Sequence, residues 1–150
     1  MNSQFFQHLT QEHAAVGAFI ELLDQEAAAM QQGRYADLPA LIECKSRLAD
    51  RLAILGRQRE NEQMRLGYRA DRQGAETLAA AGGPSLQKVW HALCAAAAQA
   101  HEHNHRNGVM IRSHLHFTDQ FIALPERGGT PPDGPGSQHG SCVSGSSLAT

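Results

Sequence analysis

PSLQKVWHALCAAAAQAHEHNHRNGVMIRSHLHFTDQFIAL, residues 84–124, contains one glycine, Gly108, and no proline after its first residue. Apolar and small residues recur every three or four positions, which is the period of one helix face. A first-turn proline is tolerated because its missing N–H has no partner to lose. The stretch therefore predicts one helix, roughly 60 Å long at ~1.5 Å per residue. Its stripe comprises Leu86, Val89, Leu93, Ala97, Ala100, Asn104, Gly108, Ile111, Leu115, Thr118 and Ile122.

A first helix is predicted over residues 3–32, with Ser3 as its cap and Gly33 at its end, because glycine adopts the left-handed terminal conformation cheaply. A second helix is predicted from Asp37 to Leu55. The short link between them favours an antiparallel hairpin. The first stripe comprises Phe5, Leu9, His13, Val16, Ile20, Leu23, Ala27 and Met30, and the second comprises Leu38, Leu41, Lys45, Leu48, Leu52 and Leu55.

Residues 56–82 are polar nearly all round, so their periodicity does not distinguish an extension of the second helix from irregular structure, although partial helix is favoured. No strand-like alternation occurs anywhere. We therefore predict an all-α fold, an antiparallel bundle of three long helices in residues 1–124. Glycine, proline and serine make up 15 of the last 26 residues, so 125–150 are predicted to be a disordered tail.

Composition excludes several classes of protein. The net charge of -2, with acids and bases interspersed, gives no basic footprint for nucleic acid and no polybasic membrane patch. The N-terminus lacks a signal-peptide pattern, and no run approaches ~20 apolar residues, so we expect a cytoplasmic protein without membrane insertion. The sequence contains no phosphate loop, nucleophile elbow or HExxH motif. Neither an enzyme nor a cofactor is predicted.

Five of the nine histidines lie between Ala100 and Phe117. His101 and His105 are one helical turn apart, as two ligands of a helical metal site would be. A third ligand is missing from their neighbourhood, and Arg112 places a positive charge on the same face. A partly solvated polar face is the simpler interpretation, and a His-dependent metal-binding protein is the alternative.

Asn104 lies at the centre of the predicted stripe, and Asn107 borders it. Asparagine is a poor helix former, so two asparagines on the predicted core side of a helix are expected to have a specific role. They either fix helix register through amide hydrogen bonds or contact a ligand directly. The adjacent Gly108 would let another backbone come close.

A second apolar strip, formed by Met110, Phe117 and Phe121, begins after Gly108. It lies roughly 100° around the helix from the first stripe. The bundle itself or a homo-oligomer could bury it, and it could also form a groove for a partner helix.

Two segments resemble the FlgN-type flagellar export chaperones. RYADLPALIECKSRLADRLAIL, residues 34–55, resembles the family's short turn and leucine-striped helix carrying a lysine. AHEHNHRNGVMIRSHL, residues 100–115, resembles the family's later helix with its Asn-x-x-Asn-Gly element followed by an apolar pair. The similarity in helix order and length covers residues 5–124.

The resemblance implies a cytoplasmic chaperone without ATPase activity. Such chaperones bind the hook-filament junction proteins FlgK and FlgL before secretion and deliver them to the flagellar type III export apparatus. We expect a client's C-terminal helix to dock on the second apolar strip. No tyrosine follows Tyr68, so the Tyr-Gly element that often follows this helix in relatives is missing. The implied client-binding residues, with the second strip, are Asn104, Asn107, Gly108, Met110, Ile111, Leu115, Phe117, Phe121 and Ile122. A helical adaptor with another partner is a further alternative.

Overall fold

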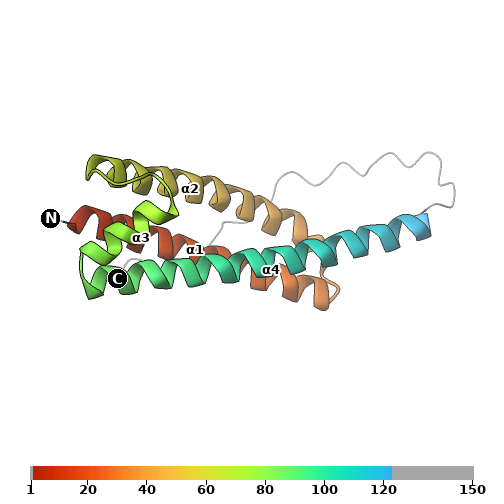
Figure 1. The fold of residues 1–150 in the computed structure, drawn as a ribbon. Helices are drawn as coiled ribbons and strands as arrows, with labels where there is room; N and C mark the ends of the chain where they lie inside the picture. Colours follow the sequence, from red (N-terminus) through yellow and green to blue (C-terminus); the bar gives the residue numbers. More distant parts are fainter. Residues whose placement is uncertain (1, 123–150) are drawn as a thin grey trace.

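The computed structural model describes the backbone of residues 2–122 and the side chains of residues 2–113. This part of the chain is helical and has no strand, which confirms the all-α prediction. The predicted tail, residues 125–150, lies outside it. The elements are α1 (Ser3–Gln31), the 3-10 turn η1 (Tyr35–Asp37), α2 (Leu38–Arg65), α3 (Arg72–Ala81) and α4 (Pro84–Ile122) (Figure 1).

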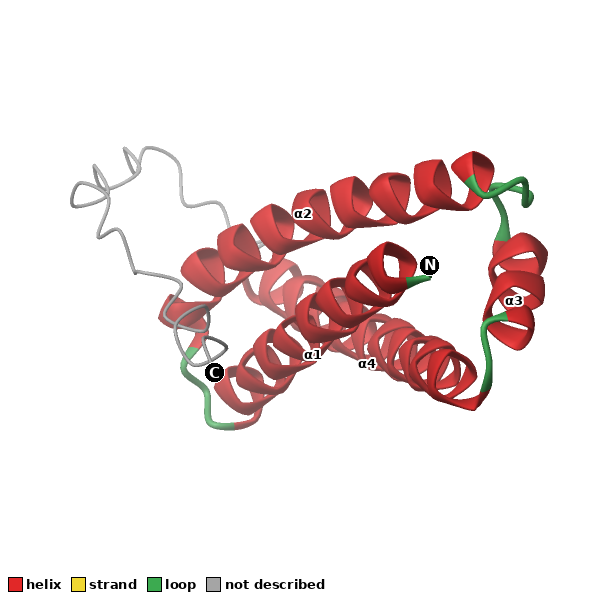
Figure 2. Ribbon diagram, turned by 90° about the vertical axis from the view of Figure 1, so that its left-hand side faces the viewer, coloured by secondary structure: helices red, strands yellow, loops and turns green. Residues whose placement is uncertain are grey.

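Helix α1 is the centre of the arrangement. It packs against both α2 and α4, whereas no Cα atom of α2 comes within 8 Å of one in α4 over the described residues. Figure 2 shows α2 and α4 diverging toward the short helix α3, which contacts both of them and closes the open end. The molecule is therefore a V of two helices with α1 between its arms.

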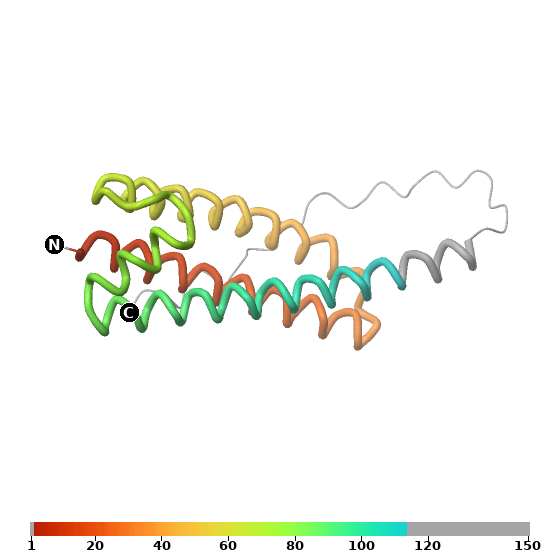
Figure 3. Tube along the Cα trace, in the orientation of Figure 1, coloured from red at the N-terminus to blue at the C-terminus, as the bar shows by residue number. Residues whose placement is uncertain are grey.

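The predicted bundle of three antiparallel long helices is not confirmed in its details. Helices α1 and α2 form the expected antiparallel hairpin, and α4 runs antiparallel to α2 and so parallel to α1 (Figures 1 and 3). The difference from the prediction is that α2 and α4 do not pack on each other over the described residues. The extra helix α3 lies between the end of α2 and the start of α4 and contacts both of them. A fourth helix therefore joins the three that the periodicity predicts.

The predicted helix ends are correct at Gly33 and at Pro84. Gly33 has a φ of +70°, and the Arg34 N–H donates to the Ala29 carbonyl over 2.8 Å, which satisfies a carbonyl of the last turn. Pro84 is the first residue of α4. Ser3 is the first residue of α1 rather than its cap. Asn2 occupies the cap position, and its side chain makes no capping hydrogen bond.

The polar segment after Leu55 is ordered by its own polar side chains. Gln63, which is 0% exposed, donates to the carbonyls of Arg69 and Asp71 over 2.6 and 3.0 Å and so ties the α2–α3 loop to α2. The Asp71 carboxylate accepts from the Gly74 N–H over 2.8 Å and caps α3. Partial helix over residues 56–82 is thus confirmed.

The buried face of α4 agrees only in part with the predicted stripe: Leu86, Leu93 and Ala100 are buried as predicted, whereas Trp90 and Asn107, outside the stripe, are buried as well. Asn104 and Ala97, predicted to lie in the stripe, are exposed, while Asn107 is only 3% exposed. The reason is that α4 packs along one central helix, which selects a narrow seam with a seven-residue repeat rather than a broad stripe. His13 on α1 is likewise exposed, contrary to prediction. The buried positions of α4 are Leu86, Trp90, Leu93, Ala100 and Asn107.

Candidate functional site

A buried carboxylate on α1 joins the three long helices. Glu26 is 1% exposed, and the Lys45 ammonium from α2 lies 3.0 and 3.2 Å from its two oxygens. Lys45 also donates to the Asn104 Oδ1 of α4 over 3.2 Å. Asn107 Nδ2 donates to Glu26 Oε1 over 3.1 Å and to the Leu23 carbonyl over 2.7 Å. We call this group, Glu26, Lys45, Asn104 and Asn107, the Glu26 clasp.

A second group of the same design lies toward α3. The Arg59 guanidinium of α2 donates from Nε to Glu12 Oε2 over 2.6 Å. Its central carbon lies 5.5 Å from the centre of the Trp90 ring on α4, within the range of a cation–π contact. We call Glu12, Arg59 and Trp90 the Glu12 clasp. In both clasps an acid of α1 holds a cation of α2, and that cation reaches α4.

The two clasps are related by sequence spacing. Fourteen residues separate Glu12 from Glu26, Lys45 from Arg59, and Trp90 from Asn104. Fourteen residues are two heptads, so the members of each pair lie on the same helix face. Long cationic side chains therefore bridge α2 and α4 at two levels, where their backbones are too far apart to pack.

These contacts assign a structural role to part of the predicted client site. The Asn107 amide is buried and bonded within the monomer, as the register interpretation requires. Asn104 is exposed and bonds only to Lys45 among the described residues. A Cβ at Gly108 would come within 4 Å only of the Arg112 side chain among the described residues. No other backbone of that part of the chain approaches Gly108 closely, and α4 continues through it as helix.

The apolar residues of the predicted site divide into two groups. Met110 and Ile111 are half-buried against a small cluster formed by Ala29, Met30 and Leu38 at the α1–α2 connection. The remaining four lie in the helical part of α4 whose side chains are outside the described residues. They are Leu115, Phe117, Phe121 and Ile122.

The histidines do not assemble in the described region. His101 and His105 are both exposed on α4, and His103 lies with its Nδ1 3.5 Å from the Asp24 carboxylate. Within the side chains described, no three His, Cys, Asp or Glu residues are grouped so that they could hold a metal ion. The same region has no helix long and apolar enough to cross a membrane.

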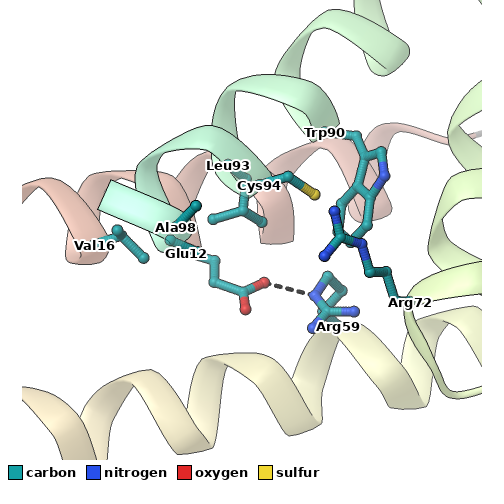
Figure 4. Close-up of a pocket in the computed structure, with 9 residues that line it drawn as sticks. Glu12, Val16, Arg59, Arg72, Trp90, Leu93, Cys94 and Ala98 are labelled. Carbon is teal, nitrogen blue, oxygen red and sulfur yellow. Dashed lines mark hydrogen bonds and ion pairs between the residues drawn. The ribbon is translucent and has the colours of Figure 1, made fainter. Parts of the chain in front are cut away.

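An open cleft of about 420 Å³ lies beside the Glu12 clasp, between α2 and α4 (Figure 4). Its polar groups are Glu12, Arg59 and Arg72, and the thiol of Cys94 borders it. Burial raises the pKa of the Cys94 thiol, so the thiol is protonated at neutral pH. Its other lining residues are Val16, Trp90, Leu93, Ala97 and Ala98.

The sequence interpretation missed the residues that join the helices. Lys45 is counted in the predicted apolar stripe of the second helix, and periodicity does not single out Glu12, Glu26, Arg59 or Trp90. A signal did exist: acids on the first helix and bases on the second recur at the same two-heptad spacing. In an antiparallel hairpin this spacing pairs each acid with a base.

A helical hairpin and a long helix that runs parallel to its first member and continues past it (Figure 1) define the chain as an all-α helical protein. The chain belongs to the FlgN family, since the family model described as FlgN protein matches residues 1–131. This confirms the resemblance inferred from the sequence. The family consists of flagellar export chaperones rather than enzymes, and its members generally bind flagellar hook-associated proteins. No curated protein and no solved structure matches the chain.

Proposed function

We propose that this chain is a cytoplasmic export chaperone for the hook-filament junction proteins FlgK and FlgL. It binds their C-terminal helices, prevents their premature assembly and delivers them to the flagellar type III export apparatus. Membership of the FlgN family supports the chaperone role in general. The choice of FlgK and FlgL as clients and the delivery step are our proposal.

The observation that carries the proposal is the position of the C-terminal part of α4. In Figure 1 this part extends past the α1–α2 connection, where neither helix of the hairpin accompanies it. The same part carries Phe117, Phe121 and Ile122 in its sequence. An amphipathic client helix that lays its apolar face along such a strip would gain affinity from burial of both apolar surfaces.

The nine predicted client-binding residues then contribute in two ways. We propose that Met110, Ile111 and the four residues beyond them contact the client. Asn104, Asn107 and Gly108 lie in the last turns of α4 that pack on the hairpin, just before Met110 and Ile111. Because Asn107 is already bonded to α1, it contributes by fixing the direction in which the client-binding part of α4 leaves the bundle.

Substitution of the strip tests this proposal. The double variant Phe117→Ser/Phe121→Ser should retain its helix content by circular dichroism but lose co-purification with FlgK and FlgL. Phe6→Ser is the matched control, since Phe6 is a 39% exposed phenylalanine near the other end of the molecule. Retention of both clients by the double variant would show that the client surface is assigned wrongly.

A further inference from the structure

The cleft beside the Glu12 clasp has the composition of a protein-binding site. It exists because α2 and α4 diverge and because the α4 residues facing the gap, Ala97 and Ala98, are too small to fill it. Its floor is apolar and is formed by Val16 and Leu93. Tryptophan and arginine beside such a floor are the residues that most often dominate binding energy at interfaces.

The charges in the cleft are not balanced. Glu12 pairs with Arg59 at 2.6 Å, so these two charges offset each other. Arg72, in the first turn of α3, makes no hydrogen bond or ion pair with any described residue. Figure 4 shows its side chain at the edge of the cleft near Trp90. The lining residues Glu12, Arg59 and Arg72 therefore carry a net charge of +1 beside an apolar floor, which favours an occupant with a carboxylate next to its apolar side chains.

The volume of the cleft limits the size of the group that can enter it. About 420 Å³ is at the lower end of ligand pockets, which span roughly 300–1,000 Å³. It is too small for a whole helix but large enough for the side chains of one helical turn. The walls are themselves helices, which is the geometry of helix-in-groove recognition.

We propose that this cleft is a second contact site for the client, separate from the end of α4. It takes an amphipathic segment that places one or two bulky apolar side chains between α2 and α4 and a carboxylate against Arg72. This inference rests on the proposed chaperone function. It adds a contact that the end of α4 cannot provide, because the cleft lies at the α3 end of the molecule (Figure 1).

Trp90 reports on occupancy directly, because it is the single tryptophan of the chain and it lines the cleft. The probe is a synthetic peptide of the FlgK C-terminal helix with any tryptophan replaced by phenylalanine, titrated into the full chain. We expect a saturable change in Trp90 emission. Arg72→Glu should weaken peptide binding at least tenfold, and Arg57→Glu, an exposed arginine of α2 outside the cleft, should leave binding unchanged.

A steric test is independent of charge. Ala98→Trp should fill the cleft and weaken peptide binding measured by calorimetry at least tenfold, whereas Ala92→Trp, at an exposed position of α4 outside the cleft, should not. Circular dichroism on each variant establishes that the fold is retained.

The possible outcomes separate the two proposals. Peptide binding of equal strength in the parent, Arg72→Glu and Ala98→Trp would overturn the second site and leave the chaperone function standing. Failure of intact FlgK and FlgL to bind the parent chain would overturn the chaperone function and this inference with it. A dimer of the chain alone, detected by light scattering and abolished by Arg72→Glu, would show that a second copy fills the cleft and would also overturn the inference.

Discussion

At the scale of single residues, ionic groups occupy positions where a helical bundle ordinarily has apolar ones. Glu26 is 1% exposed and Lys45 is 20% exposed at the side chain. Taking two charges out of water is expensive, and the cost is recovered only where both are well bonded. Asn107 supplies the extra donor that the Glu26 carboxylate needs. Replacing Lys45 alone should therefore lower the stability of the fold more than replacing Glu26 and Lys45 together.

Lys45→Met should lower the free energy of unfolding by about 3–5 kcal/mol, because it leaves the Glu26 carboxylate buried without a counter-ion. Urea denaturation followed by circular dichroism measures this. The double variant Glu26→Met/Lys45→Met should be less destabilised than the single one. Arg47→Met, which breaks an exposed ion pair with Glu43, is the control and should cost no more than ~0.5 kcal/mol. Equal losses for Lys45→Met and Arg47→Met would contradict a structural role for the clasp.

The two asparagines should differ in their effect on stability. Asn107→Ala removes a buried amide with two hydrogen bonds and should cost about 1–3 kcal/mol of unfolding free energy. Asn104→Ala removes one exposed hydrogen bond and should cost under ~1 kcal/mol. Thermal melts of both variants test the difference. A larger loss for Asn104→Ala would favour the stripe phase predicted from the sequence over the observed one.

Glu62 gives the molecule a pH-dependent contribution to stability. Its hydrogen bonds to Arg65 lower the pKa of the carboxyl from its ordinary value of 4.5, against the opposing effect of burial. A lowered pKa in the folded state means that the contribution is present above the ordinary value and is lost as the pH falls through the lowered one. In thermal melts from about pH 6 to about pH 3, Glu62→Gln should therefore show a shallower loss of stability than the parent. Parallel curves would contradict this assignment.

At the scale of elements, sequence periodicity predicts where the long helices lie in the chain. It predicts less well which residues of each helix are buried. The caps at Gly33 and Pro84 follow from the backbone limits of glycine and proline. The seam of α4 could not be predicted in the same way, because alanine is compatible with both a buried and an exposed face. Only the packing of α4 on α1 decides that Ala100 is buried and Ala97 is not.

The start of helix α3 depends on the close approach of Gly74 to the backbone carbonyl of Arg69. A Cβ at Gly74 would overlap the backbone carbonyl of Arg69, so Gly74→Ala must displace the loop that Gln63 holds. We expect a loss of at least ~2 kcal/mol of unfolding free energy. Gly56→Ala is the matched control, since a Cβ there meets only the Glu12 side chain at an ordinary 3.7 Å. It should be neutral or stabilise by up to ~1 kcal/mol through helix propensity. A neutral Gly74→Ala in denaturant melts would contradict the packing of this loop.

At the scale of the whole molecule, the extension of α4 past the hairpin and the divergence of α2 from α4 create the two surfaces that we propose contact the client. The family could be inferred from the sequence because the lysine of the second helix and the Asn-x-x-Asn-Gly element are local patterns. The cleft could not, since it depends on Glu12, Arg59, Arg72 and Trp90, which come from four helices and meet only in the folded chain.

The central claim is that this chain binds FlgK and FlgL as a chaperone. Calorimetric titration of purified FlgK, and separately FlgL, into the full-length chain tests it most directly. We predict saturable binding of each client by the parent and at least tenfold weaker binding by Phe117→Ser/Phe121→Ser, with Phe6→Ser behaving as the parent. Absence of binding to either client by the folded parent chain would contradict the account.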